Sequence, residues 1–128
     1  MRPHIIQPAN SPKPVGPYSH AVKLGDFLFC SGQIPLTRDG KLVEGGITEQ
    51  TRQVLHNVSA ILQDQSLTCE NVVKSTVFMT NLAEFAEMNA VYQEFFQQNF
   101  PARSTIQVAA LPRGAKVEIE VIAFYPTP

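Results

Sequence analysis

Two segments with helical periodicity, each with a single apolar stripe, place the strongest constraint on the fold of this chain. After Thr48, apolar residues recur at the i, i+1, i+4, i+7, i+8 spacing of one helix face: Val54, Leu55, Val58, Ile61 and Leu62. A second helix is predicted from about residue 83 to residue 97, with core residues Phe85, Met88, Tyr92 and Phe95 as its stripe. Thr48 and Asn81 are the predicted N-caps. Because each helix is apolar on one side only, both must pack on a common layer.

That layer is predicted to be a β-sheet. Alternating side-chain patterns and flanking turn residues predict strands at residues 19–23, 27–31 and 72–80, and two more within 101–124. The order β-β-α-β-α-β-β predicts an α+β fold, with both helices on one face of a mixed sheet. Five prolines among the first 18 residues exclude a helix there and allow only short extended pieces. We expect one domain over residues 1–128, with the Pro-rich segment 1–17 as part of it.

Composition limits the partners of this domain. Charged residues make up 16% of the chain, below the roughly 25% of an average soluble domain. We therefore expect another subunit to cover part of the surface, including the second face of the sheet. The formal net charge is −1 and Lys and Arg form no run, which disfavours nucleic-acid binding.

The sequence also indicates where such a protein resides. No apolar stretch approaches the roughly 18 residues of a membrane span. The N-terminus shows neither the apolar core of a secretion signal nor an Arg-rich amphipathic import pattern. We therefore expect a cytoplasmic protein with no membrane partner.

Cysteine and histidine residues are few and scattered. Cys30 lies in an apolar run and Cys69 in a polar turn, so both are expected to be free thiols in a reducing compartment. His4, His20 and His56 form no metal-ligand spacing. We expect no metal site.

The two strands within 101–124 carry the charged residues of greatest interest. Arg103 and Thr105 share one side of the first strand, and Glu118 and Glu120 share one side of the second. Residues 111–114 between them have the composition of a turn. We predict that one sheet presents the guanidinium and a carboxylate close together, which suits a small zwitterionic or imino-acid ligand. The alternative is a solvated sheet face, the commoner setting of Glu and Arg.

Five sequence blocks resemble one known family, the RidA/YjgF reactive-intermediate deaminases. They are PVGPYSHAV, FLFCSGQIP, QTRQVLHNV, VVKSTVFMTNLAEFAEMNAVYQEFF and FPARSTIQVAALPRGAKVEIEVIA, and the similarity runs from about Pro14 to Ala123. The resemblance implies a chorismate-mutase-like fold with a six-stranded mixed sheet, assembled as a homotrimer with a ligand cleft at each subunit interface. It also implies hydrolysis of 2-aminoacrylate, 2-iminopropanoate and 2-iminobutanoate to 2-oxo acids and ammonia, without a metal or an organic cofactor.

The resemblance further implies roles for individual residues. Arg103 matches the arginine that grips the substrate carboxylate, and Glu118 matches the acid that positions the water or the substrate nitrogen. Thr105 stands where some members have Cys, and its hydroxyl is still able to hydrogen-bond. Residues matching the lining of the family pocket are Tyr18, Ser31, Gly32 and Asn89. Glu120 has no such counterpart.

Several of these positions also have plainer interpretations. Tyr18 either packs over the substrate or anchors the Pro-rich loop. Gly32 is equally consistent with an ordinary turn, and Asn89 with the solvent side of its helix. Glu118 beside Arg103 is expected to stay ionised, because a neighbouring positive charge lowers the pKa of a carboxyl group.

Two other functions remain open from the sequence. One is a non-enzymatic trimeric regulator or holdase chaperone that uses the same carboxylate-binding cleft. The other is an endoribonuclease or translation inhibitor, which the net charge of −1 and the lack of a basic stripe disfavour.

Overall fold

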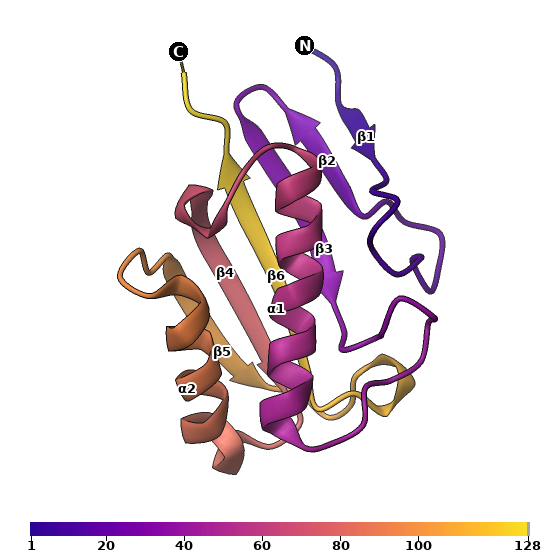
Figure 1. Cartoon of the computed structure of the whole chain (residues 1–128), viewed down its shortest axis with the longest axis vertical. Coiled ribbons are helices and arrows are strands. Elements are labelled where there is room, and N and C mark those ends of the chain that lie inside the picture. Colours follow the sequence, from indigo (N-terminus) through magenta and orange to yellow (C-terminus); the bar gives the residue numbers. More distant parts are fainter. Residues whose placement is uncertain (128) are drawn as a thin grey trace.

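The computed structural model describes residues 1–127, which form one six-stranded sheet and two helices (Figure 1). In chain order the elements are β1 (His4–Ile6), β2 (Ala21–Leu24), β3 (Phe27–Gln33), α1 (Ile47–Asp64), β4 (Val72–Met79), α2 (Phe85–Phe96), β5 (Ala102–Gln107) and β6 (Val117–Phe124). The sheet order is β1-β2-β3-β6-β4-β5, with only the β4–β5 pair parallel. Both helices lie on the same face of the sheet in Figure 1. The predicted α+β fold with a mixed sheet is confirmed.

The core lies between the two helices and one sheet face. All five predicted apolar residues of α1 are at most 1% exposed, so the helical periodicity identified its buried face correctly. In α2, Met88 and Tyr92 are buried, whereas Phe85 is 38% exposed and therefore not a core residue. The prediction for Phe85 is wrong because its turn of the helix lies at the rim of the sheet, beside the edge strand β5 rather than over the centre.

The helix starts differ in part from the prediction. The N-cap of α1 is Gly46. The Gly46 N–H group donates a 2.8 Å hydrogen bond to the Glu49 carboxylate. Thr48 therefore lies inside the first turn, and its predicted role as a cap is wrong. Asn81 does act as a cap, because its side chain accepts from the Ala83 N–H at 3.0 Å. It caps a short 3₁₀ turn that precedes α2.

The Pro-rich N-terminus supplies the sixth strand. β1 is only three residues long and pairs antiparallel with β2, with Ile6 opposite Ala21. This agrees with the short extended pieces predicted for the segment. Residues 7–20 then form a loop that leads into β2.

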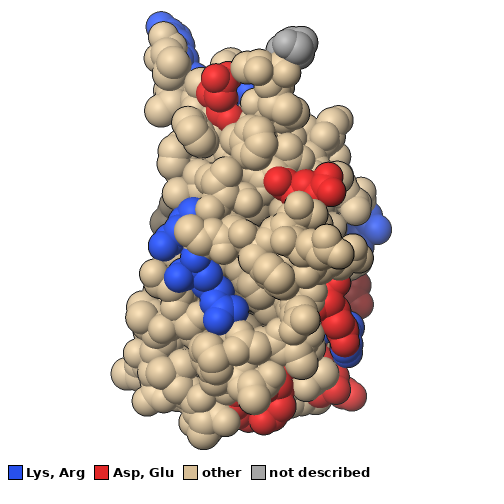
Figure 2. Space-filling view, turned by 90° about the vertical axis from the view of Figure 1, so that its left-hand side faces the viewer, with Lys and Arg blue, Asp and Glu red and all other residues tan. Residues whose placement is uncertain are grey.

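The second face of the sheet carries no helix and exposes several large apolar residues. Phe27, Phe29 and Ile106 are 44–47% exposed there, and the strand register places Ile122 beside Phe29. Figure 2 views the side of the molecule at α2 and β5, where the surface is mostly uncharged around one cluster of Lys and Arg and several Asp and Glu residues. An apolar sheet face of this kind is typical of a surface that another protein subunit covers. No helix formed by residues 1–127 is long and apolar enough to span a membrane.

Candidate functional site

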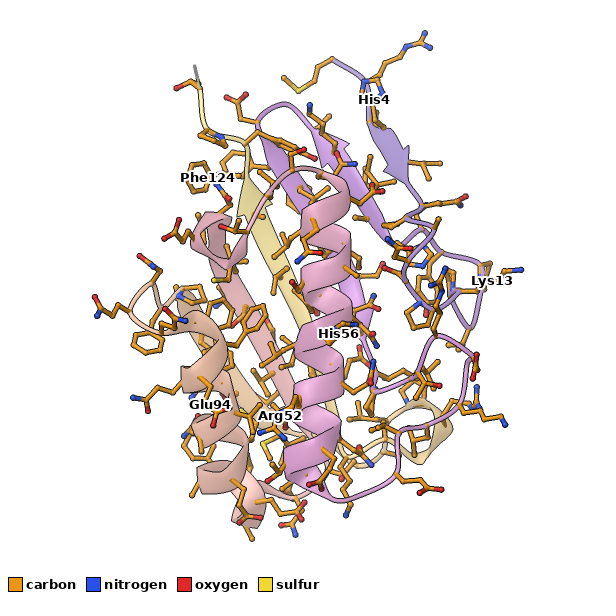
Figure 3. All side chains as sticks on the ribbon, viewed as in Figure 1. His4, Lys13, Arg52, His56, Glu94 and Phe124 are labelled. Carbon is orange, nitrogen blue, oxygen red and sulfur yellow. The ribbon has the colours of Figure 1, made fainter. Side chains whose placement is uncertain are left out.

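Arg103 lies on the edge strand β5, and its side chain points to the helix-covered side of the sheet. The register pairs it with Ser75, which is fully buried beneath α2. Its guanidinium carbon is 4.7 Å from the centre of the Tyr92 ring and 5.5 Å from that of Phe85. Within residues 1–127 the one ion pair joins Arg52 of α1 to Glu94 of α2 (labelled in Figure 3), so no acid neutralises Arg103. A half-buried cation without a counter-ion is available to bind an anion.

A hollow of about 370 Å³ opens beside this guanidinium. We call it the arginine hollow; its lining residues are Asn89, Tyr92, Gln93, Phe100, Pro101 and Arg103. Asn89 comes four residues after Phe85 on α2, so the two share a helix face. Asn89 is half-buried and lines this hollow, and its role in ligand binding stays a prediction.

Thr105 lies on the same face of β5 as Arg103, two residues further on. Its hydroxyl oxygen is buried and has no hydrogen-bond partner within residues 1–127. A buried hydroxyl in this state has its full capacity to donate and accept a hydrogen bond. The predicted hydrogen bond from Thr105 to a ligand stays a prediction.

Glu118 lies on β6, on the apolar face of the sheet that has no helix. Its carboxyl group approaches Gly32 so closely that a Cβ atom there would lie 2.8 Å from the Glu118 carboxyl carbon. Gly32 belongs to an irregularity in β3, because the pairing with β6 shifts register between Cys30 and Gln33. The lack of a side chain at position 32 therefore leaves room for the Glu118 carboxyl group against the strand, and a larger residue would force that carboxyl group to shift.

The pKa of Glu118 is raised, first by burial and then by repulsion from Glu120. We expected the opposite direction. The reason for the difference is that Arg103 is not beside Glu118 in this chain. A carboxyl group with a raised pKa is better suited to exchange protons near neutral pH than an ordinary glutamate.

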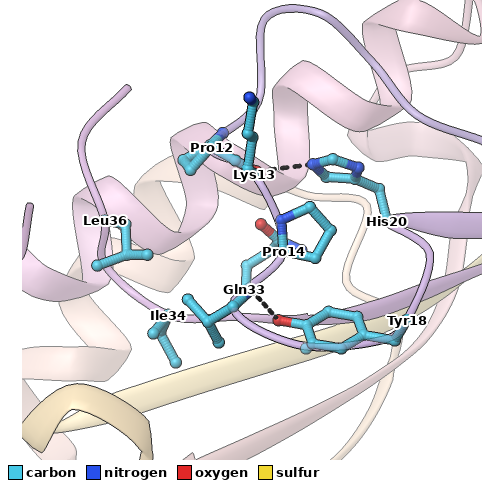
Figure 4. A pocket seen from close by; sticks show the side chains of 10 residues that line it. Pro12, Lys13, Pro14, Tyr18, His20, Gln33, Ile34 and Leu36 are labelled. Carbon is cyan, nitrogen blue, oxygen red and sulfur yellow. Dashed lines mark hydrogen bonds between the residues drawn. The ribbon is translucent and has the colours of Figure 1, made fainter. Parts of the chain in front are cut away.

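A second hollow lies next to Gly32, beneath the loop that precedes β2 (Figure 4). The Tyr18 hydroxyl accepts a 3.2 Å hydrogen bond from the Val15 N–H, and the Nε2 atom of His20 is 2.7 Å from the Pro12 carbonyl oxygen. Ser31 is tied to the same region, because its hydroxyl donates to the Ser19 carbonyl at 2.6 Å. Tyr18 thus anchors the Pro-rich loop, as one of its two predicted roles requires, while 43% of the residue stays exposed.

The structure separates the predicted site residues into two groups. Arg103 pairs with Ser75 of β4, whereas Glu118 pairs with Phe78. Ser75 and Phe78 are three positions apart, so they point to opposite faces of the sheet. The prediction that one sheet holds Arg103 and Glu118 close together is therefore wrong for a single protomer. The physical reason is that β4 lies between β5 and β6, which are consecutive in the sequence but not neighbours in the sheet.

Several residues around Arg103 are not predicted from the sequence. Spacing alone places Phe85 in the core, and nothing in the sequence marks Phe100 and Pro101 as lining residues of the hollow. The available signal was the i, i+4, i+7 spacing of Phe85, Asn89 and Tyr92, which places one polar residue between two aromatic residues on one helix face.

The cysteine residues take no part in either group. Both are free thiols, as predicted, and burial raises the pKa of Cys30 to about 12. Such a thiol stays protonated and unreactive at neutral pH. Among residues 1–127 no three His, Cys, Asp or Glu side chains gather in a way that would hold a metal ion.

Comparisons with known proteins extend over nearly the whole chain. The family model described as Endoribonuclease L-PSP matches residues 8–125. A RutC family protein of Pyrococcus horikoshii is 46% identical over 94% of this chain and 96% of its own length. The 2-iminobutanoate/2-iminopropanoate deaminase of Capra hircus is 44% identical over 93% of this chain and 88% of its own length.

Solved structures agree with these relatives. The crystal structure of Escherichia coli TdcF with bound serine superposes with a TM-score of 0.91 at 40% identity, over 96% of this chain and 99% of TdcF. Because the family model and these relatives span most of the sequence, the chain belongs to the Endoribonuclease L-PSP family, the RidA/YjgF family that its sequence blocks resemble.

Proposed function

We propose that this protein hydrolyses reactive 2-imino acids and their enamine precursors to 2-oxo acids and ammonia. The observation that carries the proposal is Arg103, a half-buried guanidinium without an acidic partner beside a hollow large enough for a small acid. The deaminase of Capra hircus, whose name specifies 2-iminobutanoate and 2-iminopropanoate, supports the substrate class. The serine bound to TdcF supports a ligand with a carboxylate and a neighbouring nitrogen.

We further propose that the active site forms between two protomers of a homotrimer. Arg103 and Glu118 lie on opposite faces of the sheet, so a site that uses both requires two copies of the chain. The apolar sheet face around Phe29 and Ile106 needs a cover, and a neighbouring copy provides it. In this arrangement the arginine hollow of one protomer faces the Gly32–Glu118 region of the next.

The proposed chemistry follows from these two groups. Arg103 binds the substrate carboxylate with two parallel N–H donors and thereby fixes the plane of the C=N bond. Glu118 holds a water molecule and accepts a proton from it as the water oxygen attacks the imine carbon. When the imine is protonated, this addition gives a neutral carbinolamine. Glu118 returns its proton to the amine nitrogen, the C–N bond breaks to release ammonia, and the hydroxyl proton passes to the departing ammonia as the C=O bond forms, so Glu118 is ionised again. The proposed steps use no cofactor.

The raised pKa of Glu118 predicts the acid side of the pH profile. If ionised Glu118 is the active form, activity rises as pH passes upward through its pKa, which burial and Glu120 raise. Replacing the exposed Glu120 by glutamine removes the second cause, so the acid limb of kcat should move to lower pH. The Arg103 guanidinium of the next protomer lowers the pKa of Glu118 in the parent and in Glu120→Gln alike, so the acid limb still moves to lower pH in the variant. The measurement is the pH profile of kcat for the parent and for Glu120→Gln. An acid limb at the same pH or at higher pH in the variant contradicts the role of Glu118.

The direct test of the function is a time course of 2-oxo acid and ammonia release from freshly generated 2-iminopropanoate. We expect release well above the rate without protein. Binding of a 2-oxo acid without any acceleration would instead identify a small-molecule-binding regulator.

The family description also names an endoribonuclease, but the observations on this chain favour it less. The arginine hollow contains one Arg and no His or Lys, whereas backbone contacts to RNA require several positive charges. Cleavage of RNA by the purified protein that disappears in Arg103→Ala would overturn this ranking.

A further inference from the structure

The unusual property of Arg103 is the way in which it is held. Arginine side chains inside proteins are commonly held by carboxylates, which occupy the N–H donors and cancel the positive charge. Arg103 is held instead by two aromatic rings of α2, with its guanidinium carbon 4.7 Å from the Tyr92 ring centre and 5.5 Å from that of Phe85. Both distances are within the range of a cation–π interaction.

Tyr92 is itself held rigidly. It is 4% exposed, and its hydroxyl oxygen is 2.6 Å from the hydroxyl oxygen of buried Ser75, the residue that pairs with Arg103 across the strands. Its ring also packs against Phe96, with 4.6 Å between the ring centres. Burial raises the pKa of the Tyr92 phenol and outweighs the hydrogen bond to Ser75 and the charge and hydrogen bonding of Arg103, which act to lower it, so the phenol stays neutral. Tyr92 is therefore a fixed platform for the guanidinium.

Phe85 occupies the first residue of α2, seven positions before Tyr92 and on the same helix face. It is 38% exposed although it is a large apolar residue, and it is not part of the buried core. Within the protomer, the contact of its ring with the Arg103 guanidinium is therefore the interaction of interest.

We propose that Phe85 and Tyr92 are positioning residues that form an aromatic clamp, which orients Arg103 toward a bound carboxylate without an ion pair that would occupy its paired hydrogen-bond donors. An aromatic ring attracts the cation through its π electrons and does not bind a pair of N–H donors as a carboxylate does, so donors of the guanidinium remain for the ligand. As a consequence, the arginine binds acids while it stays ordered in the unliganded protein, and the entropy cost of ordering it on binding is reduced. The consequence for catalysis rests on the proposed function, but the orientation of Arg103 does not.

The sharpest variant is Phe85→Leu, because this exposed position tolerates the change. Its matched control is Phe95→Leu on the same helix, where a half-buried ring packs edge-on against Phe96 and does not contact Arg103. Phe85→Tyr keeps an aromatic ring and should restore the parent behaviour. The first readout is the NMR order parameter of the Arg103 Nε–H bond, which we expect to fall in Phe85→Leu and to remain at the parent value in Phe95→Leu and Phe85→Tyr.

The second readout is binding of 2-oxobutanoate by calorimetry. Losing a cation–π contact should raise Kd by about 3- to 30-fold in Phe85→Leu, with KM rising more than kcat falls. An unchanged Arg103 order parameter in Phe85→Leu overturns the clamp, and so does an equal loss in Phe95→Leu. If the order parameter falls but no variant, including the parent, hydrolyses imino acids, the clamp stands and the proposed function fails.

Discussion

Replacing Arg103 by alanine is expected to lower kcat/KM for 2-iminopropanoate by about 10²- to 10³-fold, the usual loss when one preorganised charge-stabilising donor is removed. The guanidinium is the one group in the arginine hollow that carries a positive charge, so nothing else there replaces its grip on the carboxylate. Arg103→Lys should recover only part of the loss, because an ammonium keeps the charge but not the planar pair of donors. Steady-state kinetics on freshly generated substrate provide the measurement.

The fold should survive this change. Arg103 forms no ion pair, and alanine is compatible with the edge strand that carries it. Circular dichroism and sedimentation of Arg103→Ala should therefore match the parent. The control is Arg38→Ala, which removes an exposed arginine of the loop after β3 and should leave activity unchanged. Loss of assembly together with activity in Arg103→Ala would show that the residue is structural.

The second large effect is expected for Glu118→Gln, which should lower kcat by about 10²- to 10⁴-fold, the usual contribution of general acid–base catalysis. Glutamine has nearly the same shape, so it still fits against Gly32, but it no longer accepts and returns a proton. The affinity for 2-oxobutanoate should change far less than kcat, because Arg103 binds the carboxylate.

Glu120→Gln is the matched control for this variant. Glu120 lies two residues further along the same strand face and is exposed. Its replacement should leave kcat at the optimum pH close to the parent value. Turnover by Glu118→Gln at the parent rate would exclude the proposed proton transfer.

The sequence predicts local structure here better than it predicts which residues meet. The apolar stripe of α1 is correct because burial of one helix face depends on periodicity within a single segment. The pairing of Arg103 with Glu118 fails because it depends on which strands are neighbours. β4 comes about thirty residues before β5, yet it lies between β5 and β6 and puts the two charges on opposite faces.

Smaller errors have similar causes. Gly46 rather than Thr48 is the cap because the Glu49 side chain reaches back to the Gly46 N–H group. Phe85 looks like a core residue by spacing alone. In the structure Phe85 lies at the rim of the sheet. Its ring contacts Arg103 and is partly exposed, so it is not a core residue.

The most direct test of the shared site is to mix two inactive variants. Arg103→Ala and Glu118→Gln protomers, unfolded together and refolded at equal concentration, should regain activity at about a quarter of the sites, because random assembly pairs an intact arginine with an intact glutamate that often. Each variant refolded alone should stay inactive. If the mixture also stays inactive although it assembles like the parent, then Arg103 and Glu118 of different protomers do not work together and the account is wrong.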